Sequence, residues 1–328
     1  MIKKNGLIGV LAVALVADIA IGQELDLRIP DIDGGLDERG SVARRAGKVE
    51  IHTAFQPGLT YRFVTRNEIR AQFPVHGSRE VITEQQARLD SGFRNDGGPG
   101  MALQATTERL KMEIRSSEHS IQYDSLEAAD RKSELGRHLN SALTRRLELI
   151  VSNSNEVVSS IQKGREASSA PIEGVPQFGG DELVHLVEIL LQAMPKEKVW
   201  PGERWTIQGN RQFAESGKMG FDITCRFRGE VRHEQSSFLQ IDLTGTASGS
   251  IPSALPNESE AIEEKMIPFE VPSISGRILY DPLQKMVHLL DCTVIMKVEA
   301  SGAEGVGGVL VPVQQRTTVE LLHIIPTP

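Results

Sequence analysis

The chain has 328 residues, of which 36 are lysine or arginine and 44 are aspartate or glutamate, so its formal net charge is −8 at pH 7. Binding to nucleic acid or to anionic lipid requires a concentration of positive charge, and no block of basic residues supplies one. We therefore expect no nucleic-acid partner.

The N-terminal segment has the layout of a secretory signal peptide. Two lysines precede an apolar run from Leu7 to Ala17, and small residues follow, including Ala20 and Gly22 at suitable positions for cleavage. The sequence predicts that residues 1–22 are a signal peptide cleaved near Gly22 and that the protein is periplasmic or extracellular. An uncleaved anchor is the alternative, although the run is about half of the roughly 20 apolar residues that span a bilayer. We predict no membrane span in the mature chain.

Residues 23–48 mix glycine with opposite charges without a period, which predicts a flexible leader. From Val49 to Phe55, apolar and polar residues alternate as in a strand, and the Pro57-Gly58 pair follows as a turn. The polar, glycine-containing stretch from Thr83 to Gly100 predicts a long exposed loop.

The clearest strand pattern is ERLKMEIR, in which Leu110, Met112 and Ile114 alternate with charged residues. A strand with one solvent-exposed face indicates an antiparallel sheet. Helical spacing then predicts an amphipathic helix over about 126–143, and a second over 181–194 that Pro195 ends.

The stretch VWPGERWTI, residues 199–207, repeats the layout of FQPGLTYRF, residues 55–63. Proline before glycine is typical of a turn, so each stretch is interpreted as the corner that leads into the first clear strand of a half. Trp205 and Tyr61 would be the first inward or rim aromatics of their sheets. Trp200 does not fit an inner strand position and is the candidate for surface recognition.

These patterns predict an α+β fold, mainly antiparallel β, with two curved-sheet halves and two covering helices. The expected division is a first half over 49–167, a loop-and-helix connector over 168–194 and a second half over 195–328. A duplication that relates the halves is a hypothesis, because hairpins resemble one another by pattern alone.

Cys225 and Cys292 both fall on the apolar side of a strand pattern. Export would favour a disulfide between them, whereas two buried free thiols are the ordinary alternative for inward cysteines. Both alternatives stay open.

The sequence offers no motif specific enough to assign catalysis, a metal or a cofactor. Glu182 and His185 have a metal-site spacing but lack the second motif on a facing helix. Ser160 and Lys163 form a Ser-x-x-Lys pair without its companion motifs. We predict no catalytic residue, no metal ligand and no cofactor.

The remaining candidate site is the apolar concave face of a curved sheet under a helix, lined by Leu110, Met112, Ile114, Leu135 and Leu139. It favours an exported, non-catalytic envelope protein that binds an apolar ligand or another envelope protein. A structural or assembly module without a small-molecule site is the alternative. A hydrolase comes third, because no nucleophile and base stand at a recognisable spacing.

The signal peptide, the hairpin from ERLKMEIR to QYDS, the entry PKEKVWPGERW and the strand GRILYDP together resemble a group of exported bacterial proteins that share a domain of unknown function. That resemblance implies no activity and no catalytic residue. The order of strands and helices is also loosely similar to the half-barrels of periplasmic lipoprotein carriers, which bind acyl chains. This chain differs from a single carrier domain because it is expected to have two sheet halves. That difference puts a shared cavity in doubt.

Overall fold

The structure is a computed structural model that describes residues 47–73, 77–94, 98–116, 120–153, 156–163, 181–213, 217–252, 266–300 and 309–327. The signal peptide and nearly all of the leader lie outside these ranges. The strands described are β1 Leu59–Phe73, β2 Gly77–Phe93, β3 Met101–Arg115, β4 Ser120–Asp124, β5 Arg146–Val151, β6 Val157–Lys163, β7 Arg204–Phe213, β8 Gly217–His233, β9 Ser236–Pro252, β10 Met266–Asp281, β11 Met286–Ala300 and β12 Val309–Pro326. The helices described are α1 Ala128–Lys132, α2 Glu134–Thr144 and α3 Asp181–Gln192.

All twelve strands belong to one antiparallel sheet in the order β6-β5-β3-β2-β1-β12-β11-β10-β9-β8-β7, with β4 paired to the far end of β3. Mainly antiparallel β structure is therefore confirmed. The sheet is continuous, because β1 pairs with β12 over most of their length, so the expected two separate sheet halves are not seen. The helices are few beside this sheet, and mainly-β describes the fold better than α+β.

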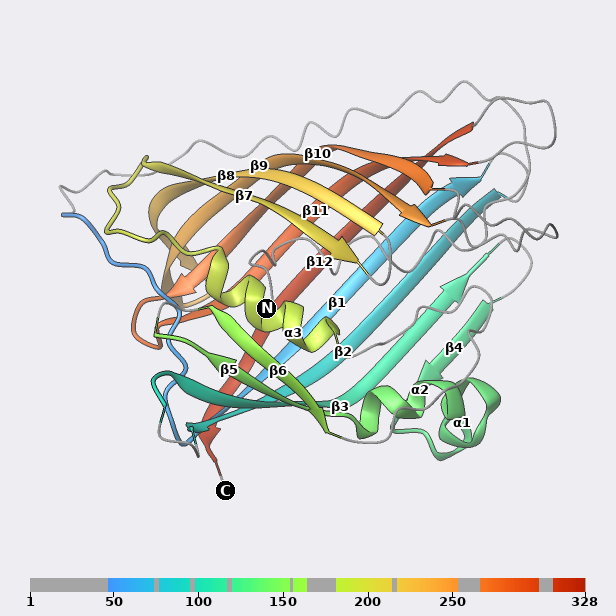
Figure 1. Ribbon diagram of the computed structural model, residues 1–328, viewed down its shortest axis with the longest axis horizontal. Helices are drawn as coiled ribbons and strands as arrows, with labels where there is room; N and C mark the ends of the chain where they lie inside the picture. The colour runs from blue at the N-terminus through green and yellow to red at the C-terminus, as the bar shows by residue number, and fades with distance from the viewer. Residues whose placement is uncertain are drawn as a thin grey trace.

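The sheet is strongly curved, and α3 lies against its concave side in front of β1 and β12 (Figure 1). Helix α3 is apolar around most of its circumference and largely buried, as expected for a helix inside a curved sheet. Helices α1 and α2 lie beside β3 and β4 (Figure 1). The single helix predicted over 126–143 is divided at Ser133, whose hydroxyl accepts a hydrogen bond from the Gly136 backbone N–H at 2.9 Å and caps α2. None of the described helices combines the length and apolarity needed to cross a bilayer.

The prediction of a long loop over Thr83–Gly100 is wrong. Most of that stretch belongs to strand β2, which pairs with β1 on one side and β3 on the other. Its inward side chains include the buried Thr83, Gln85 and Ser91, so the apolar alternation that identifies a half-buried strand is interrupted. The sequence pattern did not identify β2 as a strand because several of its buried side chains are polar.

Both Pro-Gly pairs are corners that lead into a strand, as predicted. Gly58 and Gly202 have φ values of +81° and +93°, a region that favours glycine. The N–H of Gly58 donates to Ser91 O of β2, and that of Gly202 donates to Phe227 O of β8. The strand equivalent to β8 in the first half is therefore β2.

The predicted strand over Val49–Phe55 is not part of the sheet; its one bridge pairs Val49 with Val199, which lies between α3 and β7 and outside the strands. The segment is extended, with Ile51, Thr53 and Phe55 buried. Its hydrogen bonds go to α3 and to the β10–β11 turn: the Thr53 hydroxyl donates to Leu190 O at 2.6 Å, and Ala54 N donates to Lys285 O at 2.9 Å. The segment 49–55 therefore anchors the C-terminal end of α3.

Candidate functional site

The inner face of the sheet carries the core. On each long strand, buried side chains alternate with exposed or half-buried ones, and the buried set forms a single hydrophobic cluster that includes most of α3. The outer face is charged and wet, with cross-strand ion pairs such as Arg70–Glu80 and Arg316–Asp291. This separation of faces is the usual arrangement of an antiparallel sheet that is solvated on one side.

The five residues proposed from sequence to face an apolar ligand come together in this core. Leu110, Met112, Ile114 and Leu139 are buried and Leu135 is partly buried, where α2 packs against β3. Neither of the two cavities described below is lined by any of them. Ligand contact at these five positions stays a prediction.

An uncharged polar band interrupts the apolar inner face where β12, β1, β2 and β3 lie side by side. Cross-strand pairing places Thr65 opposite Gln85, and Asn67 between Thr83 and Thr317. The Thr317 hydroxyl donates to Asn67 Oδ1 at 2.7 Å, and Gln85 Nε2 donates to Thr107 Oγ1 at 2.8 Å. The members of this polar band are Thr65, Asn67, Thr83, Gln85, Thr107, Gln315 and Thr317.

A small cavity of about 20 Å³ lies between the polar band and α3. The helix contributes Glu182, Leu186 and Ile189 to its lining, and the sheet contributes Val319 together with five members of the band. A volume of this size accommodates about one water molecule, since roughly 10–15 Å³ is the minimum. Sequence reasoning missed this site because most of its residues lie on β2, which was taken for a loop, or at positions without an apolar period.

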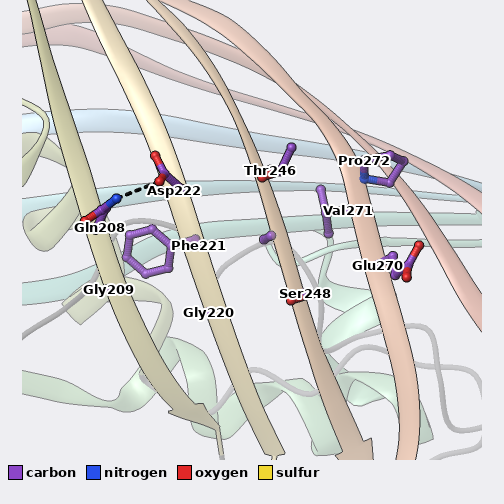
Figure 2. A pocket seen from close by; sticks show the side chains of 11 residues that line it. Gln208, Gly209, Gly220, Phe221, Asp222, Thr246, Ser248, Glu270, Val271 and Pro272 are labelled. Atoms are coloured by element: carbon purple, nitrogen blue, oxygen red, sulfur yellow. Dashed lines mark hydrogen bonds between the residues drawn. The ribbon is translucent and has the colours of Figure 1, made fainter.

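A larger depression of about 750 Å³ lies over β7, β8, β9 and β10 (Figure 2). The exposed side chains of Gln208, Asp222, Thr246, Ser248 and Glu270 border it, and Gly209 and Gly220 contribute bare backbone. Gln208 Nε2 donates to Asp222 Oδ2 at 2.6 Å. Within the described chain neither Asp222 nor Glu270 is paired with a cation, whereas Asp242 on the same face pairs with Arg228. The sequence pattern did not predict this depression.

The ion pairs that shift pKa values lie on the outer face and line neither cavity. Arg109 forms a two-pronged contact with Asp124, which lowers the pKa of the Asp124 carboxyl and raises that of the guanidinium. Burial raises the pKa values of Tyr61, Tyr123 and Tyr280. These shifts come from surface ion pairs and desolvation, and they do not gather around a cleft.

Trp200 is 48 % exposed at the corner before β7, and its backbone N–H donates to Glu203 Oε2 at 2.7 Å. A recognition role for this indole remains a prediction. Trp205 is partly buried at the edge of the core, and Tyr61 is fully buried, where its hydroxyl accepts a hydrogen bond from Gln56 N at 2.6 Å.

Both cysteines are free and buried, so the disulfide alternative is not formed. Cys225 pairs across strands with Leu243, which pairs with Gly276, which pairs with Cys292. Three interstrand steps place the two cysteines about 14 Å apart, and a disulfide needs Cα atoms within about 7 Å. Desolvation raises the pKa of each thiol to about 12.

The structure places the residues with a metal or catalytic spacing on α3 and on β6. His185 Nδ1 lies 3.2 Å from Glu188 Oε2 on its own helix, and Ser160 lies on the edge strand β6. No group of three or more potential metal-ligating side chains occurs in the described ranges.

No protein-family model and no curated protein sequence matches the chain. A structure of lipovitellin, described for its lipid–protein interactions, is similar at a TM-score of 0.45 and 13% identity over 84% of this chain. The chain spans about a quarter (26%) of the lipovitellin chain that it matches. DynF from the dynemicin biosynthesis pathway of Micromonospora chersina matches at a TM-score of 0.22 and 8% identity, over 92% of this chain and 93% of that chain. Both TM-scores lie below 0.5, so neither likeness identifies a function.

Proposed function

We propose that this chain is a non-catalytic binding protein that holds an apolar ligand on the inner face of its sheet, beyond the part that α3 covers. The observation that carries the proposal is the incomplete cover of the long strands. Helix α3 crosses the strands (Figure 1), so it covers about one helix diameter, roughly 10 Å, of β1, whereas the 15 residues of β1 extend about 50 Å. Figure 1 shows the strands continuing well past α3.

The inner face beyond α3 is apolar on both sides of the junction between β1 and β12. The side chains concerned are buried and belong to the same cluster as the rest of the core: Ile69, Ala71, Val81, Ile114, Val294, Met296, Val311 and Val313. Apolar walls with a few polar groups are the usual lining of a small-molecule site. Because each of these side chains is at most 7 % exposed, a ligand reaches them only if the inner face opens, and it must then be apolar to match them.

A substitution that adds volume separates a ligand site from a filled core. Ala71 lies on this part of the inner face, and Gln72 is the next residue of β1 with its side chain exposed. In a ligand site, Ala71→Leu should weaken binding of the neutral apolar probe N-phenyl-1-naphthylamine about tenfold and change the free energy of unfolding by less than about 0.5 kcal/mol. In a filled core the same change should destabilise the protein by about 1–3 kcal/mol.

Gln72→Leu is the matched control and should change neither quantity. Destabilisation by Ala71→Leu together with no probe binding to the unsubstituted chain would contradict the proposal.

A second candidate function is recognition of another envelope protein at the depression over β7–β10. It is favoured by two exposed carboxylates, Asp222 and Glu270, that form no ion pair within the described residues, although Lys297 of β11 lies opposite Glu270. A basic segment would match them in charge. Capture of a lysine-rich peptide that is lost in Asp222→Asn with Glu270→Gln, and retained in Glu234→Gln on the β8–β9 turn, would support it. Equal capture by all three proteins would exclude it.

Export is part of the proposal, supported by the charge and apolar pattern of residues 1–22. Mature protein recovered from the periplasm or the medium should begin near Gln23. An intact N-terminus on the functional protein would contradict cleavage.

A further inference from the structure

We propose that the leader closes the free edge of β7: residues 24–29 pair with this strand and extend the sheet by one strand. The inference goes beyond the proposed function and does not depend on it. The occupant is a segment of the same chain that lies outside the described ranges, and the edge that receives it lies within them.

The edge of β7 has unused pairing capacity and an incompletely covered margin of the core. Among the described strands, β7 ends the sheet and pairs only with β8. Alternate residues of an edge strand direct their backbone N–H and C=O groups away from the sheet, where another strand can pair with them. Cys225 and Ile223 of β8 are 0 % and 2 % exposed, whereas Trp205 and Ile207, opposite them on β7, are only partly buried. One more strand beyond β7 would cover this margin.

The outer side of the same edge carries positive charge that the described residues do not neutralise. Arg204 of β7 lies opposite Arg226 of β8, and neither guanidinium forms an ion pair within the described ranges. Like charges directly opposite each other destabilise a sheet. A carboxylate on a strand beside β7 would neutralise Arg204 and reduce this repulsion.

The leader contains a stretch with the matching pattern. It has no sustained period as a whole, but six of its first residues alternate between charged and apolar: Glu24, Leu25, Asp26, Leu27, Arg28 and Ile29. Such alternation is typical of a strand with one buried face. In an added strand, the three apolar side chains would extend the inner face beyond β7, and the two acidic ones would lie on the outer face with Arg204.

The leader also joins the described chain close to this edge. Val49 is bridged to Val199, and β7 begins at Arg204, five residues later in the chain. Five residues cover at most about 18 Å, whereas the segment 30–48 can extend about 60 Å, so residues 24–29 can reach any part of β7.

The other edge strand, β6, lacks the apolar margin. Opposite the buried Leu147 and Leu149 of β5, it carries Gln162 and Ser160. Apolar side chains of an added strand would meet polar neighbours there, so β7 is the edge that fits.

Backbone amide hydrogen exchange of the full chain tests the pairing. In the unsubstituted chain we expect residues 24–29 and the whole of β7 to be protected. Leu27→Asp places a charge on the apolar side of the stretch and should accelerate exchange at least about tenfold in 24–29 and in alternate residues of β7. Leu36→Asp, the same change in the leader outside the alternating stretch, is the matched control and should leave exchange in both segments unchanged.

A charge exchange tests the choice of edge. Glu24→Lys with Asp26→Lys should weaken the protection of residues 24–29, and the further change Arg204→Glu should restore part of it, because opposite charges again lie on neighbouring strands. An unaltered rate on addition of Arg204→Glu would contradict pairing beside this residue.

Rapid exchange throughout residues 24–29 of the unsubstituted chain would overturn the proposal, as would a response of β6 instead of β7 to Leu27→Asp. Native mass spectrometry identifies whose leader is bound, and we expect a monomer. A dimer that Leu27→Asp dissociates would mean that the leader of a second copy occupies the edge, and would overturn pairing within one chain.

Discussion

At the scale of single residues, polar groups on the inner face are the positions where this sheet departs from a simple apolar core. The buried threonines and glutamines of β1, β2 and β12 occupy sites that the alternation reserves for apolar side chains. Burying such groups is unfavourable unless they are hydrogen-bonded, and members of the band bond to one another, Thr317 to Asn67 and Gln85 to Thr107.

The two cysteines give a pH-dependent prediction. Their pKa is raised to about 12 by burial, from about 9 when exposed, so the folded state favours the neutral thiols. This contribution to stability is complete below pH 9 and is lost as the pH rises from about 9 towards 12.

Alkylation measures the same property, because only the thiolate reacts. At pH 8 iodoacetamide should label neither Cys225 nor Cys292 in the folded protein and both after unfolding. Labelling in the folded state at the rate of a free thiol, or a Cys225–Cys292 disulfide found by mass spectrometry, would refute the burial described here.

At the scale of elements, the sequence predicted those strands whose inward residues are apolar, such as β3 with Leu110, Met112 and Ile114. It missed β2, whose inward residues include Thr83 and Gln85. The alternation also predicted a strand over 49–55. Buried and exposed residues alternate equally well in an extended segment that bonds to a helix and a turn instead of to a strand. An alternation of apolar and polar residues indicates which side chains are buried. Whether the segment belongs to a sheet depends on strands that are distant in the sequence.

The anchoring of α3 by the 49–55 segment can be tested. Thr53 is buried and its hydroxyl donates to Leu190 O at 2.6 Å, near the C-terminal end of the helix, where carbonyl groups lack helical partners. Thr53→Val keeps the shape and removes the bond, so the free energy of unfolding should fall by about 1 kcal/mol and amide exchange should accelerate in α3.

Thr206→Val, on the exposed side of β7, is the control and should change neither quantity. Unaltered exchange in α3 of the Thr53→Val protein would mean that this bond does not hold the helix.

At the scale of the whole molecule, the chain forms one curved sheet in which the first and last strands of the fold, β1 and β12, pair at the centre. Sequence patterns predicted the mainly antiparallel character and the two Pro-Gly corners. They did not reveal that the sheet is continuous, because the β1–β12 pairing joins residues about as far apart as the chain allows. Because α3 crosses this sheet, it covers only part of each long strand, and that incomplete cover is the basis of the proposed ligand site (Figure 1).

Native mass spectrometry of the full chain, purified without detergent, tests the central claim most directly. The account predicts one bound molecule per chain that organic solvent extracts and that proves to be apolar. A chain that shows only the mass of the polypeptide and takes up no N-phenyl-1-naphthylamine would contradict it.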